Sequence, residues 1–103
     1  MRHVERLDLP ELDDEQIEEL CSRAEEAARN HVLSKVSEKE TETLDVCAWA
    51  EKKNHLTLAI DVQVKLSSRL KDFDVKTLAD EAVKAGFKSA EEYLRELACR
   101  SRR

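Results

Sequence analysis

The chain has 103 residues, of which 40% are charged and 4% aromatic, with one glycine and one proline. This length predicts a single domain over residues 1–103, and the composition favours regular elements joined by short loops over disorder. The net charge of −5 disfavours RNA or DNA as the sole partner, because nucleic-acid binders are usually basic. The sequence lacks an apolar signal core and a membrane-length apolar run, so we expect a cytoplasmic protein without a membrane partner.

The first two predicted elements are a short strand over residues 4–9 and a helix over residues 14–37. Leu7 and Leu9 would share one face of the strand, which Pro10 ends. Asp13 is a suitable N-cap for the helix, and Gln16 is its capping-box partner. The helix then shows an apolar stripe with the 3.6-residue period: Ile17, Leu20, Cys21, Ala24, Ala28, Val32 and Val36.

The clearest pattern in the sequence is the alternation over residues 56–66. Every second residue there is a large aliphatic, which predicts a strand with one apolar and one mostly polar face. We expect this strand to be the core of a sheet. Its aliphatic residues are Leu56, Leu58, Ile60, Val62, Val64 and Leu66.

A hairpin is predicted between this strand and a preceding one over residues 41–51. Residues 52–54 would form a three-residue loop, with Asn54 in the left-handed conformation that asparagine tolerates. The resulting register places Asp45 directly opposite Asp61 on the polar face. Two solvated carboxylates are the simpler interpretation, because a catalytic pair would need a pocket that shifts one pKa.

The last predicted element is a helix that begins after Asp74, a good N-cap. Ser89 and Glu92 would form a second capping box and split this segment into two helices. The apolar stripe nevertheless keeps its phase across Gly86, which favours one long helix with this glycine on its packed face.

Two features mark candidate interfaces. The stripe of the last helix is wider than packing on one sheet requires, so it contacts either another helix as well as the sheet or a partner. Trp49 lies on the polar face of the hairpin among small neighbours, where it either marks a binding surface or is covered by long side chains such as Glu51 and Lys52. The candidate interface residues are Trp49, Val83, Gly86, Phe87 and Leu94.

The side chains that carry common enzyme chemistry are absent or scattered. A single glycine excludes a glycine-rich phosphate loop, and His3, His31 and His55 show no metal-binding spacing. We therefore expect no enzyme activity, no metal and no cofactor. Cys21, Cys47 and Cys99 lie on or near apolar positions, which predicts buried, reduced thiols. The basic tail could weakly contact RNA through Arg100, Arg102 and Arg103.

The expected fold is α+β, with the order strand, helix, strand, strand, helix and both helices on one face of an antiparallel three-stranded sheet. To this order the sequence adds Leu-Pro-Glu-Leu at residues 9–12, an acidic first helix and Asp-Val-x-x-Leu at residues 74–78. With these features the chain resembles a small archaeal family of uncharacterised proteins. That family is in turn similar to the small dimerising subunit of KEOPS, the complex that makes the threonylcarbamoyl-adenosine modification of tRNA.

The resemblance implies a non-catalytic accessory or dimerisation subunit of a tRNA-modifying complex. Its partners would be a homologous small subunit or a second copy of the chain, together with a catalytic subunit that contacts the helices. The acidic first helix disfavours direct contact with tRNA. The alternatives are a stand-alone protein–protein interaction module and, more weakly, an RNA binder that uses the basic tail.

Overall fold

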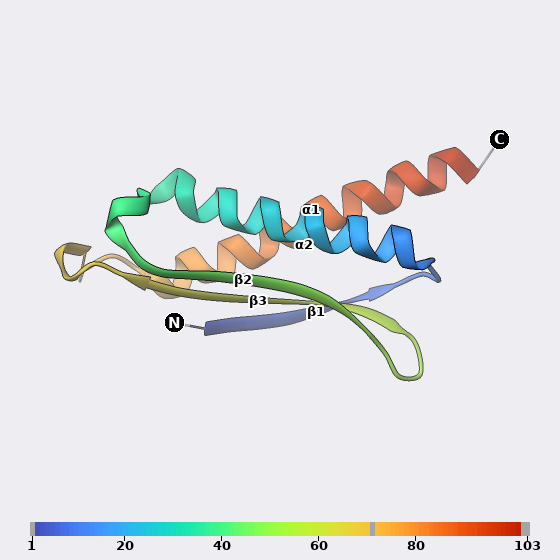
Figure 1. Cartoon of the computed structure of the whole chain (residues 1–103), viewed down its shortest axis with the longest axis horizontal. Coiled ribbons are helices and arrows are strands. Elements are labelled where there is room, and N and C mark those ends of the chain that lie inside the picture. The colour runs from blue at the N-terminus through green and yellow to red at the C-terminus, as the bar shows by residue number, and fades with distance from the viewer. Residues whose placement is uncertain (1, 71, 102–103) are drawn as a thin grey trace.

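The computed structural model describes residues 2–70 and 72–101 (Figure 1). The strands are β1 (Arg2–Leu9), β2 (Thr41–Lys52) and β3 (Leu56–Leu66), and the helices are α1 (Asp14–Lys35) and α2 (Val75–Ser101). Short 3-10 turns span Glu38–Glu40 and Ser68–Leu70. The strands form one antiparallel sheet in the order β1-β3-β2, and both helices cover the same face of it (Figure 1). The predicted α+β fold and element order are confirmed. Within the described residues, neither helix is sufficiently long and apolar to cross a membrane.

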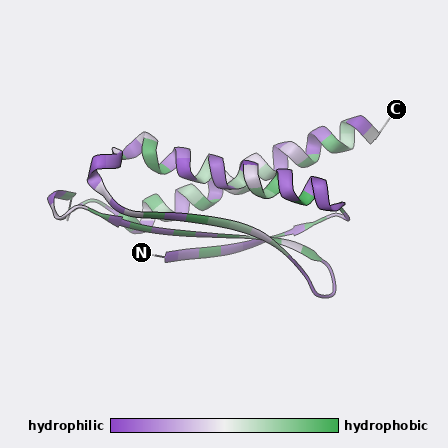
Figure 2. Cartoon of the chain, viewed as in Figure 1, coloured by the Kyte–Doolittle hydropathy of each residue, from purple (hydrophilic) through white to green (hydrophobic). Residues whose placement is uncertain are grey.

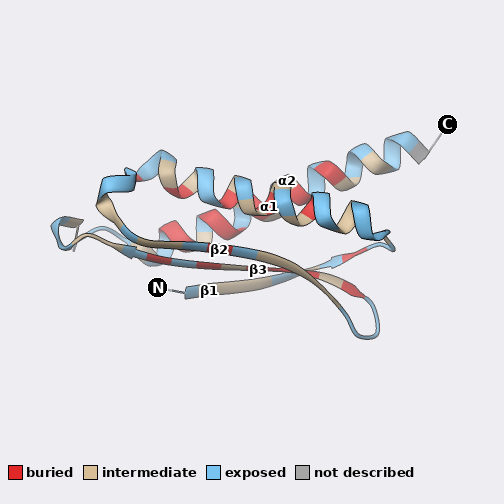
Figure 3. Cartoon of the chain, in the orientation of Figure 1, coloured by how far each residue is buried: buried red, intermediate tan, exposed pale blue. Residues whose placement is uncertain are grey.

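The core lies between the central strand β3 and the two helices, where buried residues gather in Figure 3. Hydrophilic residues lie on the outer sides of the helices (Figure 2). Leu58, Ile60 and Val62 of β3 are fully buried, because the helix-facing side of the strand carries its large aliphatics. The predicted stripe of α1 also enters this core, through Leu20, Ala24, Ala28 and Val32.

The predicted helix starts are confirmed. Asp13 Oδ1 accepts the Gln16 backbone N–H at 2.8 Å, and Gln16 Oε1 accepts the Asp13 N–H at 3.0 Å. Asp74 caps α2 by accepting the Thr77 N–H at 3.0 Å. The first strand begins two residues earlier than predicted, and α1 ends at Lys35 rather than near residue 37.

Helix α2 runs unbroken through Gly86, so the single long helix is confirmed and the second capping box does not form. Gly86 is buried against β3 and α1. The wide stripe of α2 is explained by its packing on α1 and on the sheet at the same time.

The hairpin register differs from the predicted one by two residues. Strand β2 continues through Lys52, so residues 53–55 form the loop, and Asp61 lies opposite Cys47 rather than Asp45. No described residue other than glycine has a positive φ, so the left-handed Asn54 is also wrong. A shift of two residues keeps every side chain on its predicted face, so the alternation alone does not distinguish the two registers.

Candidate functional site

One face of the sheet carries no helix of the described chain, because α1 and α2 both pack on the other face (Figure 1). We call it the open sheet face. The strand registers assign its side chains. They are Arg2, Val4, Arg6 and Asp8 of β1, Thr57, Ala59, Asp61, Gln63 and Lys65 of β3, and Thr43, Asp45, Cys47, Trp49 and Glu51 of β2.

Trp49 is tied into a hydrogen-bonded bridge that spans the open sheet face. Its indole Nε1 donates to Glu51 Oε1 at 2.8 Å, and Arg6 Nε donates to Glu51 Oε2 at 3.4 Å. Arg6 and Trp49 lie on opposite edge strands, and Ala59 pairs with both across the central strand. Ala59 is fully buried although it is on this face. A small residue at this position leaves room for the two larger side chains above the sheet.

Trp49 and Arg6 both stabilise the ionised form of the Glu51 carboxyl group. The indole hydrogen bond, and after it the hydrogen bond and charge of Arg6, lower the pKa of Glu51. The ring of Trp49 therefore has one edge fixed to an anionic carboxylate and stays partly exposed. The sequence left open whether Trp49 is covered by Glu51 or free, and the structure shows both a contact with Glu51 and remaining exposure.

A second charged pair lies farther along the same face. Arg2 and Asp61 approach to 2.8 Å, and this carboxylate raises the pKa of Arg2. The side chain of Asp61 is only 16% exposed. Cys47, its cross-strand neighbour, is exposed.

The outer edge of β2 is partly capped by α1. Glu25 Oε1 accepts the backbone N–H of Ala48 at 2.9 Å. Unpaired N–H groups on an edge strand are a template for pairing with another chain, so this contact blocks one such donor. Nothing in the helical pattern of the acidic first helix shows that Glu25 reaches a strand.

The predicted interface residues of α2 do not lie together on one surface. Val83 and Gly86 belong to the core and have no surface to offer to a partner. Phe87 lies beside the β1 edge, in a hollow with Leu7 and Lys88. Leu94 lies in a different hollow with Leu12.

The basic tail is described only in part. Arg100 is exposed at the end of α2, whereas Arg102 and Arg103 lie outside the described residues. The free end of α2 extends away from the sheet in Figure 1.

The predicted burial of all three thiols is wrong for Cys47 and Cys99, which are exposed. Cys47 points to the open sheet face and Cys99 lies in the last turns of α2, so neither meets the core. Cys21 is partly buried, and desolvation raises the pKa of its thiol.

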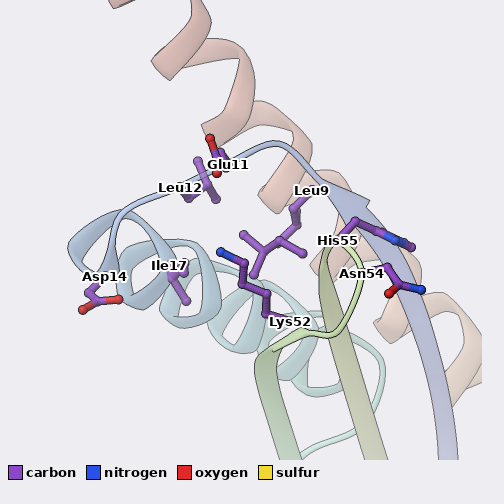
Figure 4. A pocket seen from close by; sticks show the side chains of 9 residues that line it. Leu9, Glu11, Leu12, Asp14, Ile17, Lys52, Asn54 and His55 are labelled. Carbon is purple, nitrogen blue, oxygen red and sulfur yellow. The ribbon is translucent and has the colours of Figure 1, made fainter.

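A pocket of about 350 Å³ lies between the hairpin tip and the segment that joins β1 to α1 (Figure 4). In Figure 4 the side chain of Lys52 extends from the hairpin toward Leu12 and Ile17, which gives a small apolar wall with one cation. Three separate segments meet here, so no local pattern in the sequence predicts it.

Two curated archaeal proteins are similar to the chain over most of its length. An uncharacterised protein of Thermococcus kodakarensis, TK0644, is 31% identical over 97 residues, which are 94% of this chain and 89% of that protein. An uncharacterised protein of Pyrococcus horikoshii, PH0533, is 28% identical over 98 residues, which are 95% of this chain and 84% of that protein.

Two solved structures share the fold. A crystal structure from Thermococcus onnurineus NA1 has a TM-score of 0.85 at 30% identity and covers 97% of this chain and 96% of that chain. The solution structure of the hypothetical protein mth677 from Methanothermobacter thermautotrophicus has a TM-score of 0.63 at 27% identity, over 87% of this chain and 97% of that chain. A family model described as a protein of unknown function, DUF3194, matches residues 9–93. The chain therefore belongs to the DUF3194 family.

Proposed function

We propose that the protein is a non-catalytic interaction subunit that binds another protein through the open sheet face. The observation that carries this proposal is the partly exposed Trp49, held by Glu51 and Arg6 on a face without a covering helix. Tryptophan and arginine are enriched among residues that dominate binding energy at protein interfaces. A ring that is already fixed loses little side-chain entropy when a partner covers it.

The charge pattern of this face indicates a polar partner surface. Arg2 is paired with Asp61 and Arg6 with Glu51, while Asp45 and Lys65 are exposed near them. Mixed charges around an aromatic centre favour a protein with complementary charges over a nucleic acid. The net charge of −5 supports the same choice.

The finer form of the proposal is an accessory subunit of a KEOPS-type tRNA-modifying complex in the cytoplasm. It rests on the resemblance of the element order to the small dimerising subunit of that complex. The partner would then be a homologous small subunit or a second copy, with a catalytic subunit nearby. Pairing through the β2 edge would require Glu25 to release the Ala48 N–H, so we propose the open sheet face as the first contact.

The test is to purify the tagged protein from its own source and to identify the proteins that co-purify with it. The parent chain is compared with the Trp49→Ala and Phe73→Ala variants. Phe73 is an exposed aromatic in the loop before α2 and is not one of the residues of the open sheet face, so its loss removes an aromatic ring from another part of the chain. We expect Trp49→Ala to lower the amount of co-purified partner by tenfold or more. Phe73→Ala should recover as much partner as the parent chain does. Circular dichroism must show that both variants are folded.

The outcomes distinguish the general proposal of an interaction subunit from the finer proposal of a KEOPS-type accessory subunit. KEOPS subunits in the bound fraction support the finer form. A different protein partner that is lost with Trp49→Ala contradicts the tRNA-modification role and keeps the interaction subunit. A partner that binds Trp49→Ala as well as the parent chain overturns the role of the open sheet face.

A further inference from the structure

Three metal-ligating side chains converge between β1 and α2, on the helix side of the sheet and away from the open sheet face. His3 and Glu5 are two residues apart in β1, and their β3 partners, Val62 and Ile60, both face the helices. Asp80 lies in the second turn of α2, which packs on β1. One ligand atom from each of His3, Glu5 and Asp80 lies within 4.8 Å of the other two.

The distances around His3 fit a shared cation. Its Nε2 lies 3.2 Å from Glu5 Oε2 and 3.4 Å from Asp80 Oδ1. Two ligands of a tetrahedral zinc ion, with bonds of about 2.0–2.1 Å, are about 3.3–3.4 Å apart. Cis ligands of an octahedral magnesium ion are closer, about 3.0 Å.

A second observation that supports a bound cation concerns the Nε2 nitrogen of His3. Nε2 of His3 is shielded from solvent and, among the described residues, has no hydrogen-bond partner of good geometry, although two carboxylate oxygens are its neighbours. A buried nitrogen in this position is expected to have a partner. A cation placed among the three side chains would satisfy it and both carboxylates at once.

Lys84 contacts the Asp80 carboxylate on the oxygen that does not face His3. Its Nζ lies 3.0 Å from Asp80 Oδ2. Oδ1 of the same carboxylate remains directed toward His3. The lysine thus orients the carboxylate from outside, as partners behind the ligands do in metal sites.

We propose that His3, Glu5 and Asp80 bind a zinc-type divalent cation, with three protein ligands and one open position. The side chains of His3, Glu5 and Asp80 are 30%, 43% and 35% exposed, so the ion reaches the site and Glu5 can rotate to close the remaining separation. The cation joins the first strand to the last helix, two elements at opposite ends of the sequence. The histidine spacing alone predicted no metal, because only the packing of α2 on β1 brings Asp80 to the His-x-Glu pair.

The test is isothermal titration of Zn²⁺ into the untagged chain, followed by Co²⁺ absorption spectroscopy. Cys47→Ser and Cys99→Ser form the parent background, because exposed thiols also bind zinc. We expect one ion per chain, a tetrahedral Co²⁺ spectrum without a thiolate band, and an unfolding temperature that rises with Zn²⁺ concentration.

Matched variants decide whether the bound ion occupies this site. His3→Gln and Asp80→Asn should each weaken Zn²⁺ binding by about tenfold or more. His55→Gln should leave it unchanged, because His55 meets a single carboxylate, that of Asp8, at 2.9 Å in an exposed position. Equal affinity of His3→Gln and the parent, or the absence of saturable Zn²⁺ binding, overturns the proposal. Circular dichroism of each variant shows whether the fold is retained.

Discussion

Gly86 of α2 lies so close to Ile60 of β3 that a side chain at the glycine has no free space. A Cβ built on Gly86 would be 2.8 Å from Ile60 Cδ1 and 3.0 Å from the backbone oxygen of Ala24. The glycine therefore sets how closely α2 approaches both the central strand and α1. The apolar stripe alone indicated which face of the helix packs, and this contact shows how tightly.

Gly86→Ala is expected to destabilise the protein by about 1–2 kcal/mol. Alanine gains about 1 kcal/mol of helix propensity, but overpacking a filled core typically costs about 1–3 kcal/mol. The backbone oxygen of Ala24 cannot move away as a side-chain end can, so the steric cost should dominate. Urea unfolding followed by circular dichroism measures the difference.

The control for this prediction is the same change in an Ile60→Val background, which deletes the nearest methyl group. The cost of Gly86→Ala should fall there by about 0.5–1 kcal/mol, because contacting residues are energetically coupled. An equal cost in both backgrounds would show that Ile60 does not limit the approach.

Much of the fold could be predicted from the sequence because its patterns are strong and mutually consistent. The alternation in β3 and the helical stripe of α1 each determine which side chains face the core, and the structure places them there. The hairpin register could not be fixed in this way. A slide of two residues conserves every face, and the loop contains no glycine to set the turn.

Asp13→Ala is expected to cost about 1 kcal/mol of stability, because it removes the side-chain oxygen that accepts the Gln16 backbone N–H. The reciprocal bond, from the backbone N–H of residue 13 to Gln16 Oε1, does not use the Asp13 side chain. Asp14→Ala is the matched control, since Asp14 lies in the first turn and contributes mainly through the helix dipole, a few tenths of a kcal/mol. Chemical denaturation of both variants at low salt checks the ranking. A larger loss for Asp14→Ala would contradict the capping geometry.

Glu25→Ala is expected to make the chain self-associate, because it frees the Ala48 N–H on the β2 edge. Glu25→Gln keeps an acceptor oxygen and should remain closer to the parent. Glu26→Ala removes the same charge from the exposed neighbouring position and should have little effect. Light scattering over a concentration series measures the association, and equal behaviour of Glu25→Ala and Glu26→Ala would show that charge alone matters.

The candidate site was less predictable than the fold, for a physical reason. Trp49 was identified by its position on the polar side of the hairpin, which depends on local alternation. Its bridge to Arg6 through Glu51 depends on β1 pairing with β3, a contact between the first strand and a strand in the middle of the sequence. A different long-range contact, the packing of α2 on β1, brings Asp80 to His3.

Glu51 should titrate below the usual range of a glutamate, because Trp49 and then Arg6 stabilise its charged form. A folded-state pKa below the unfolded value means that this carboxylate contributes stability above the unfolded pKa, near 4.5, and loses it as the pH falls through the folded pKa. Carbon-detected NMR titration of the Glu51 carboxyl measures the value directly. Trp49→Phe and Arg6→Met should each raise the pKa, because the indole hydrogen bond and then the hydrogen bond and charge of Arg6 lower it in the parent chain. No change in either variant would mean that the bridge across the open sheet face does not persist in solution.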